Sequence, residues 1–403
     1  MGSSYRLPAR GPWMAATVAK KNLFFACFLI TLSGVFFTYF YHEPITRNIT
    51  SLSRRPGFIP MGKSDNLGDI FNDTLGFQKV YAINLPERTD KRDTMLLQAQ
   101  LTNFTLEMVD GVVGSKVSPK ALPYTMKQDN GTIGCWRAHL DIFNKMIDEN
   151  IQSALILEDD ADWDVSLKAQ MTEFARGSRY LLDQGDRTPF SPYGDGWDIL
   201  WYGHCYSKPD TKDGRYWVIP HDPTVAPRGS RWYFEGPSML RWENGTEPDP
   251  QPRVIYKQIY GWCTSGYAVT LRAAQRILWY SSMIPYNWSI DGGMGNMCGR
   301  SEFHDFTCIA PFPRTIGKAT PAGSKNRGSD IGDYDADKVQ KESQSENVMF
   351  SVRQNIQRLL KGETTFKSFF PNPSGDELTM EQITNVKGYP DYVEPPKKND
   401  KSQ

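Results

Sequence analysis

The sequence lacks an excess of charge of either sign. Its 403 residues include 46 lysines and arginines against 46 aspartates and glutamates, so the formal net charge at pH 7 is zero. A protein that binds nucleic acid through bulk positive charge collects basic residues, so this balance argues against a nucleic-acid partner. The chain is 39% apolar and 13% aromatic, which excludes a wholly disordered protein.

Cysteines spaced for metal binding are also missing. None of the six cysteines belongs to a CxxC motif or to the Cys/His spacing of a zinc motif, so no zinc site is predicted. Five of the cysteines follow residue 41. Because five is odd, at least one thiol must be free or paired between chains.

Charge is absent from a long apolar segment near the amino terminus. Residues 23–41 are nineteen uncharged positions, or roughly 28 Å of helix, which matches a hydrocarbon core of about 30 Å. Residues 1–22 contain four basic side chains and no acidic one, which predicts a cytosolic tail before a transmembrane signal anchor. A cleaved signal peptide is the alternative, but the bulky aromatic residues that end the segment favour an anchor.

Six N-glycosylation sequons follow the apolar segment and none precedes it, which favours a lumenal main body. The sequons begin at Asn48, Asn72, Asn103, Asn130, Asn244 and Asn287. Residues 42–76 contain several prolines, glycines and serines and are interpreted as a stalk. The expected topology is therefore single-pass type II, with the main body in the secretory lumen.

Strands alternate with helices over residues 77–335, which predicts an α/β domain with a mostly parallel central sheet. The apolar segments that indicate strands cover residues 78–85, 153–160, 197–203 and 264–271. Residues 336–403 predict one amphipathic helix, with Ser343 and Glu346 at capping-box spacing, and an otherwise largely disordered tail.

The most informative segment is Glu158, Asp159 and Asp160, at the end of an apolar strand. Ligands bind at the carboxyl ends of strands in open α/β sheets, and a divalent cation would offset the repulsion between these carboxylates. Carboxylate oxygens suit Mg²⁺ or Mn²⁺. A solvated acidic turn is the alternative. A calcium loop is excluded, because Val165 and Met171 stand where such a loop needs glycine and glutamate.

Basic side chains follow the first predicted strand. Arg88, Lys91 and Arg92 could approach a diphosphate at the edge of the sheet. Asn84 and Pro86 would shape the turn that leads to them. The alternative is an exposed helix start with solvated charges.

His139 and Asp291 are two further candidates. His139 lies on a predicted helix that leads into the acidic strand and could contact a ligand, although a hydrogen-bonded core histidine is the more common situation. Asp291 lies next to glycines and could act as a general base, with a plain Asp-Gly turn as the alternative. Glu302 and Asp305 are the second choices for the base.

Together these segments resemble glycosyltransferase family 25, which includes lipooligosaccharide and collagen galactosyltransferases. The matching pieces run in the family's order and read VYAINLPERTDKR, GTIGCWRAHLDIFNKMIDENIQSALILEDDADW, GYAVTLRAAQRIL and IDGGMGN. The anchor and stalk also resemble the usual construction of a Golgi glycosyltransferase. The chain departs from the family at Ala138, where a serine is frequent.

The resemblance implies a GT-A-like nucleotide-sugar-binding domain, with UDP-galactose as the common donor, Mn²⁺ or Mg²⁺ as cofactor and inversion at the anomeric carbon. Motif matching implies that Glu158 and Asp160 bind the metal and that Asp291 is the catalytic base. It implies donor contacts from Asn84, Arg88, Arg92, His139 and Asp159.

The resulting prediction is a metal-dependent inverting glycosyltransferase of the Golgi or another secretory-pathway membrane. It would move a sugar from a nucleotide-sugar donor to a glycan or glycoprotein acceptor. One alternative is a catalytically inactive lumenal carbohydrate-binding or scaffold protein. Another is a metal-dependent phosphodiester hydrolase that uses the same acidic residues.

Overall fold

The computed structural model describes residues 65–299, 301–303, 305–324, 327–331 and 338–395. They belong to one compact unit, Lys63–Gln403. The predicted cytosolic tail, the transmembrane segment 23–41 and most of the predicted stalk lie outside the described residues. Among the helices that the structure describes, none combines the length and the apolar character needed to cross a membrane.

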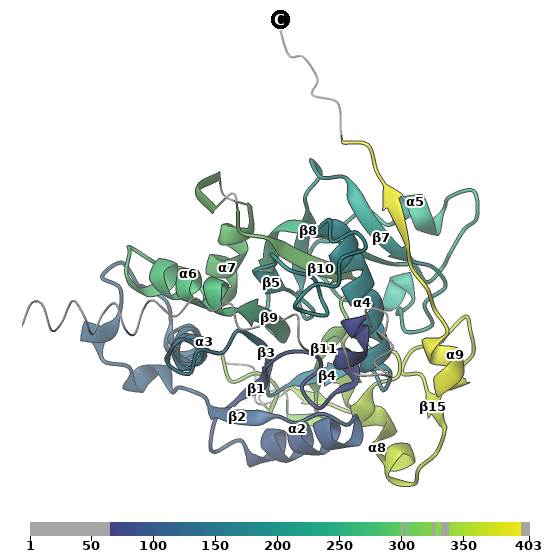
Figure 1. Cartoon of the computed structure of the whole chain (residues 1–403). Helices are drawn as coiled ribbons and strands as arrows, with labels where there is room; N and C mark the ends of the chain where they lie inside the picture. Colours follow the sequence, from purple (N-terminus) through teal and green to yellow (C-terminus); the bar gives the residue numbers. More distant parts are fainter. Residues whose placement is uncertain (1–64, 300, 304, 325–326, 332–337, 396–403) are drawn as a thin grey trace, which may run out of the picture. The chain divides into compact units, whose positions relative to one another are not determined.

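A ten-stranded mixed sheet forms the centre of this unit (Figure 1). Nine strands follow one another across it in the order β17-β7-β8-β10-β5-β9-β3-β1-β2, and β6 pairs with β8. In chain order they are β1 (Lys79–Asn84), β2 (Glu107–Asp110), β3 (Ser153–Glu158), β5 (Ile199–Leu200), β6 (Tyr206–Pro209), β7 (Arg215–Ile219), β8 (Arg253–Trp262), β9 (Gly266–Thr270), β10 (Cys308–Phe312) and β17 (Tyr389–Tyr392).

The prediction of a GT-A-like domain with a mostly parallel sheet is wrong. β1 pairs in parallel with β2 and β3, and β5 with β10, but the other six pairings in this sheet are antiparallel. Parallel neighbours need a crossover, usually a helix. Helices α2 (Thr89–Leu101) and α3 (Asn130–Asp148) provide it between β1 and β3. The chain between β5 and β9 forms mainly strands and turns, so neighbouring strands there run in opposite directions.

Helices cover both faces of the sheet (Figure 1). In β3, Leu155 and Leu157 join the apolar cluster that includes α2 and α4 (Leu167–Leu181). Ala154 and Ile156 join the opposite cluster, which includes α3, α6 (Leu271–Ser282) and α7 (Ile290–Gly299). A strand that is buried on both faces has an unbroken apolar run, which is why β3 could be predicted from the sequence.

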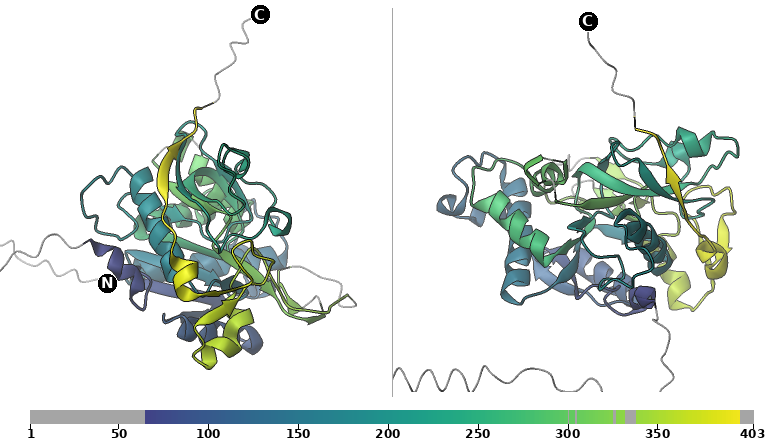
Figure 2. Two further views of the ribbon diagram at one scale, coloured as in Figure 1. Left: turned by 90° about the vertical axis from the view of Figure 1, so that its right-hand side faces the viewer. Right: turned by 45° about the horizontal axis from the view of Figure 1, so that its top comes forward.

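The fold also includes residues that were predicted to be stalk or tail. Residues 66–71 form a 3-10 helix that buries Leu67 and Ile70, so the domain begins before residue 77. The predicted carboxyl-terminal helix is α8 (Val352–Leu360), and its N-cap is Ser351 instead of Ser343. Beyond it, β17 pairs with β7 at the edge of the sheet (Figure 2). The described part of the tail is therefore folded.

Smaller elements complete the described fold, and they include a three-stranded sheet of β14, β11 and β4. These elements are β4 (Ala161–Trp163), α5 (Leu240–Glu243), β11 (Ile316–Thr320), β12 (Gly323–Ser324), β13 (Val339–Gln340), β14 (Gln344–Ser345), β15 (Thr365–Lys367), β16 (Glu377–Thr379) and α9 (Met380–Thr384).

Two disulfides form among the cysteines that the structure describes. One links Cys205 to Cys263, and the other links Cys298 at the end of α7 to Cys308 in β10. Cys135 is free. The odd cysteine count therefore leaves a thiol unpaired, as the sequence predicted.

Truncation after residue 387 should destabilise the domain, because it removes β17 and the Asp391 carboxylate. That carboxylate accepts hydrogen bonds from Trp242 Nε1 at 2.8 Å and Arg241 Nη2 at 3.1 Å. We expect a loss of roughly 2 kcal/mol and a Tm lower by several degrees in a thermal scan. Truncation after residue 395 is the control and should leave Tm unchanged. Equal Tm values for the two truncations would contradict a stabilising role for β17.

Candidate active site

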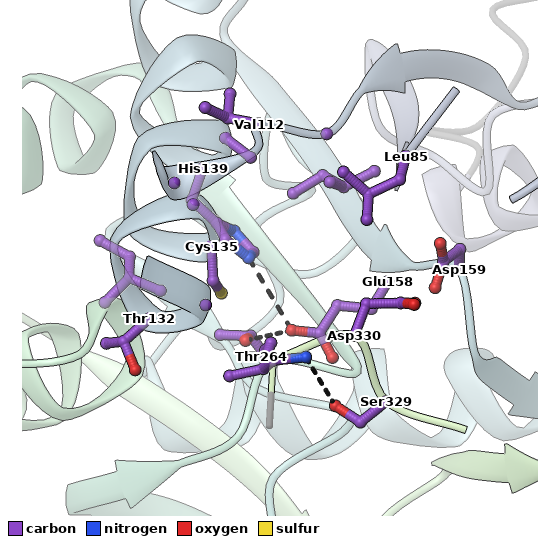
Figure 3. A pocket seen from close by; sticks show the side chains of 18 of the residues that line it. Leu85, Val112, Thr132, Cys135, His139, Glu158, Asp159, Thr264, Ser329 and Asp330 are labelled. Atoms are coloured by element: carbon purple, nitrogen blue, oxygen red, sulfur yellow. Dashed lines mark hydrogen bonds and ion pairs between the residues drawn. The ribbon is translucent and has the colours of Figure 1, made fainter. Parts of the chain in front are cut away.

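A cavity of about 600 Å³ opens at the carboxyl ends of β1 and β3. This volume is typical of pockets that hold small-molecule ligands. The walls come from α3, the first turn of α7 and residues 111–115, 263–265 and 329–331 (Figure 3). Six of the candidate residues line the cavity, namely Lys91, His139, Glu158, Asp159, Asp160 and Asp291, whereas Asn84 and Arg88 do not line it.

Glycines allow the start of α3 to pack directly against the loop after β2. A Cβ atom at Gly134 would lie 2.3 Å from the Val112 carbonyl oxygen, and one at Gly114 would lie 1.7 Å from the Asn130 carbonyl oxygen. Neither position can hold a side chain without displacing backbone. The close contact places one turn of α3, which carries Cys135 and His139, along the cavity.

The three consecutive acids differ in how far they are already neutralised. Asp159 Oδ1 accepts a hydrogen bond from Lys91 Nζ at 2.8 Å, and its Oδ2 accepts one from Asn84 Nδ2 at 3.0 Å. Asp160 Oδ2 lies 3.4 Å from Lys318 Nζ, but its buried Oδ1 has no hydrogen-bond partner within the described chain. The site thus contains a carboxylate oxygen that a cation would satisfy.

Glu158 is held from two sides. Its Oε1 accepts a hydrogen bond from the Thr264 hydroxyl at 2.6 Å and lies 3.8 Å from His139 Nε2. Burial favours the neutral form, but the imidazole and the hydroxyl outweigh it and lower the pKa of Glu158. The carboxylate is therefore ionised and oriented toward α3.

Lys91 faces the acids, and a fourth carboxylate, Asp330, joins it to Arg88, which does not line the cavity. Arg88 Nη1 donates to the two Asp330 oxygens at 2.5 and 2.6 Å, and Lys91 Nζ donates to Asp330 Oδ2 at 2.7 Å. Burial alone would lower the pKa of Lys91, but Asp160 and Asp159 raise it, so the side chain remains an ammonium ion. The Asp330 carboxylate occupies a position that suits an anionic group of a ligand.

Arg92, by contrast, is not part of the arrangement. Its side chain is exposed on α2, and it does not line the cavity. Lys91, one position earlier, is 7% exposed and lies in the cavity wall. The first turn of α2 therefore directs Lys91 inward and Arg92 outward.

Asp291 lies in a helix and not in the turn that its neighbouring glycines indicated. It belongs to the first turn of α7, where its Oδ2 accepts from the Cys263 backbone N–H at 2.9 Å and its Oδ1 from the Gly292 N–H at 2.7 Å. Later glycines of α7 serve packing, since a Cβ at Gly295 would lie 2.2 Å from the Gly261 carbonyl oxygen. The second-choice bases, Glu302 and Asp305, do not line the cavity.

The segment that carries β1, α2, α3 and β3 is recognisable by comparison with known proteins. Residues 77–188 match the family model described as Glycosyltransferase family 25 (LPS biosynthesis protein). Over these residues the chain is similar to glycosyltransferase family 25. The resemblance drawn from the sequence motifs is thereby confirmed.

Relatives of the domain match this chain over part of their length. Glycosyltransferase 25 family member of Anopheles gambiae is 24% identical over 230 residues, 53% of this chain and 30% of that protein. Procollagen galactosyltransferase 1 of Danio rerio is 24% identical over 220 residues, 51% of this chain and 29% of that protein. Inactive glycosyltransferase 25 family member 3 of Homo sapiens is 21% identical over 150 residues, 34% of this chain and 23% of that protein. The matched part of the chain thus covers less than a third of each relative.

Several side chains of the cavity lie outside the matched family 25 segment. Asp291 was predicted from its motif, but Lys318 and Asp330 were not. The ion pair between Arg88 and Asp330 spans 242 positions, so no local pattern could indicate it. Cys135 was also missed, although it lies in the most specific motif, four positions before His139.

We expect Asp330→Asn to strengthen the binding of a nucleoside diphosphate by about tenfold, because the variant removes a carboxylate that competes for Arg88 and Lys91. Calorimetric titration of wild type and variant with UDP measures the change. Asp305→Asn is the matched control, since Asp305 pairs with Arg276 at 2.7 Å outside the cavity and should leave the affinity unchanged. Weaker binding by Asp330→Asn would show that Asp330 supports the ligand instead of competing with it.

Proposed function

We propose that the chain is a metal-dependent inverting glycosyltransferase that transfers a sugar, with galactose as the first candidate, from a UDP-sugar to a glycan or glycoprotein acceptor. One observation carries the proposal: the cavity, in a chain that matches family 25 over residues 77–188, brings the acids at the end of β3 next to Lys91, and Asp330 in its wall joins Lys91 to Arg88. A nucleotide sugar carries two phosphates that need both a cation and basic side chains.

The acids fit a divalent cation. Asp160 has a buried oxygen without a partner among the described residues, and Glu158 is a second carboxylate in the same cavity. Oxygen ligands of this kind suit Mn²⁺ or Mg²⁺. Glu158 and Asp160 would hold the ion, and the ion when bound would neutralise charge on the diphosphate leaving group.

The side chains around Asp159 would position the donor. Asp159, which accepts a hydrogen bond from Asn84, holds the Lys91 ammonium beside the acids, and Asp330 joins Lys91 to Arg88. Arg88 and Lys91 would then bind phosphate oxygens in place of the Asp330 carboxylate. Asp159 contributes by orienting Lys91, which differs from the direct donor contact that the motif implied.

Asp291 is the proposed base for the acceptor hydroxyl. Its two oxygens accept backbone N–H groups from Cys263 and Gly292, which fix the carboxylate in the wall of the cavity. A carboxylate has about four acceptor positions, so it can still take a proton from a bound hydroxyl. Asp291 lies on α7, whereas the proposed metal ligands lie at the end of β3. This separation leaves the base free to act on the acceptor while the donor is bound at the acids.

A lumenal location, with a type II anchor in a Golgi or related membrane, is part of the proposal. Two disulfides and six sequons support it, because disulfides persist in oxidising compartments and sequons are modified in the secretory pathway. The anchor itself rests on the uncharged segment 23–41.

A catalytically inactive carbohydrate-binding member of the family is the second candidate. The observation in its favour is the human relative whose name describes it as inactive. Such a protein would retain the cavity and bind sugars without releasing nucleotide.

Transfer can be measured by incubating the full chain with a panel of nucleotide sugars, Mn²⁺ and glycan acceptors. We expect release of nucleoside diphosphate from one donor, and we expect a chelator to stop it. Saturable sugar binding without release in any mixture would favour the inactive candidate. Hydrolysis of simple phosphodiesters in place of transfer would indicate a hydrolase.

Asp160→Asn should lower turnover by about 100-fold or more while changing Tm little, because the substitution keeps the shape but weakens a metal ligand. Parallel thermal scans and donor assays check both quantities. Asp162→Asn is the contrasting variant. Asp162 Oδ2 accepts the hydroxyls of Ser345 and Ser351 at 2.6 and 2.5 Å, so its loss should lower Tm. Unfolding of Asp160→Asn would mean that Asp160 is structural.

A further inference from the structure

A sulfur, a nitrogen and an oxygen ligand meet on one side of the cavity. Cys135 Sγ, a His139 ring nitrogen and a Glu158 carboxylate oxygen all lie within 4.8 Å of one another. Cys135 and His139 are four positions apart on α3, so both side chains project from one face of the helix. Figure 3 shows them directed toward Glu158, which reaches the same space from the end of β3.

Two members of this set, His139 and Glu158, are held in place by other side chains. His139 is 1% exposed, and its Nδ1 forms a hydrogen bond of 2.8 Å with the Tyr267 hydroxyl. Such a bond on one ring nitrogen orients the other, and it is the usual support for a metal-binding histidine. The other nitrogen, Nε2, faces Glu158 at 3.8 Å, which is too long for a direct hydrogen bond. Thr264 anchors the carboxylate from the opposite side.

The ligand chemistry of this set differs from that of the proposed manganese site. Thiolate and imidazole are ligands that Zn²⁺ prefers, whereas Mn²⁺ and Mg²⁺ prefer oxygen. Glu158 therefore lies between two kinds of metal ligand. Asp160, two positions later in the chain, offers oxygen, whereas Cys135 and His139 on α3 offer sulfur and nitrogen. Three protein ligands with an open fourth position match the ligand count of many zinc sites that admit water.

We propose that Cys135, His139 and Glu158 form a binding site for Zn²⁺ or a similar thiophilic divalent cation. The thiol releases its proton to solvent as the sulfur–metal bond forms. Because Glu158 belongs to both ligand sets, zinc at this site displaces the proposed manganese and blocks the cavity. The sequence did not indicate the site, since Glu158 is 23 positions from Cys135 and only the fold brings them together.

Titration of the full chain with Co²⁺, as a coloured substitute for Zn²⁺, tests the proposal. We expect one Co²⁺ per chain with a thiolate-to-cobalt charge-transfer band in the near ultraviolet, and we expect Zn²⁺ to remove the band by displacement. Cys135→Ser should abolish the band and weaken zinc binding about tenfold or more. Cys27→Ser is the matched control and should keep the band, because Cys27 is not part of the set.

Absence of the band in the wild-type protein, its survival in Cys135→Ser or its loss in Cys27→Ser would each overturn the proposal. The result is independent of transfer activity. Mn²⁺ affinity, measured by electron paramagnetic resonance, should be unchanged in Cys135→Ser because the variant keeps both proposed manganese ligands, Glu158 and Asp160. A band in a protein without transferase activity supports the zinc site alone, whereas transfer without a band contradicts only the zinc site.

Discussion

The balance of charge at the end of β3 is the constraint on which the site depends. Three acids in succession leave a buried strand, and an isolated buried carboxylate is costly. Asp159 is paired with the Lys91 ammonium and accepts a hydrogen bond from Asn84, whereas Asp160 retains a buried oxygen without a partner among the described residues. The acids outnumber the cations beside them, and their negative charge keeps the buried Lys91 side chain charged. The excess of negative charge also favours a metal cation in the cavity.

Much of the site could be predicted from the sequence because it depends on local patterns. β3 is buried on both faces and therefore has an unbroken apolar run that ends at Glu158. The relative directions of the strands in the sheet could not be predicted in the same way. They depend on how the chain returns to the sheet between β5 and β9, and that segment contains strands and turns instead of crossover helices.

The remaining errors come from contacts that no short pattern describes. Arg92 and Lys91 are adjacent charged residues, and only the packing of α2 decides that Lys91 is the inward one. The glycines after Asp291 indicated a turn, but they allow α7 to lie close against β8. Asp330 and Arg88 are 242 positions apart in the sequence, so no local sequence pattern predicts their ion pair.

The cavity is divided between two parts of the chain, and one short loop joins them. The acids of β3, Lys91 and His139 lie within residues 77–188, which match the family model, whereas Asp291 lies on a later helix that a disulfide ties to β10. Asp291 of α7 accepts from the Cys263 N–H, and the next residue, Thr264, holds Glu158 of β3. The cavity therefore works as one unit only while the loop at residues 263–264 keeps the two halves in register.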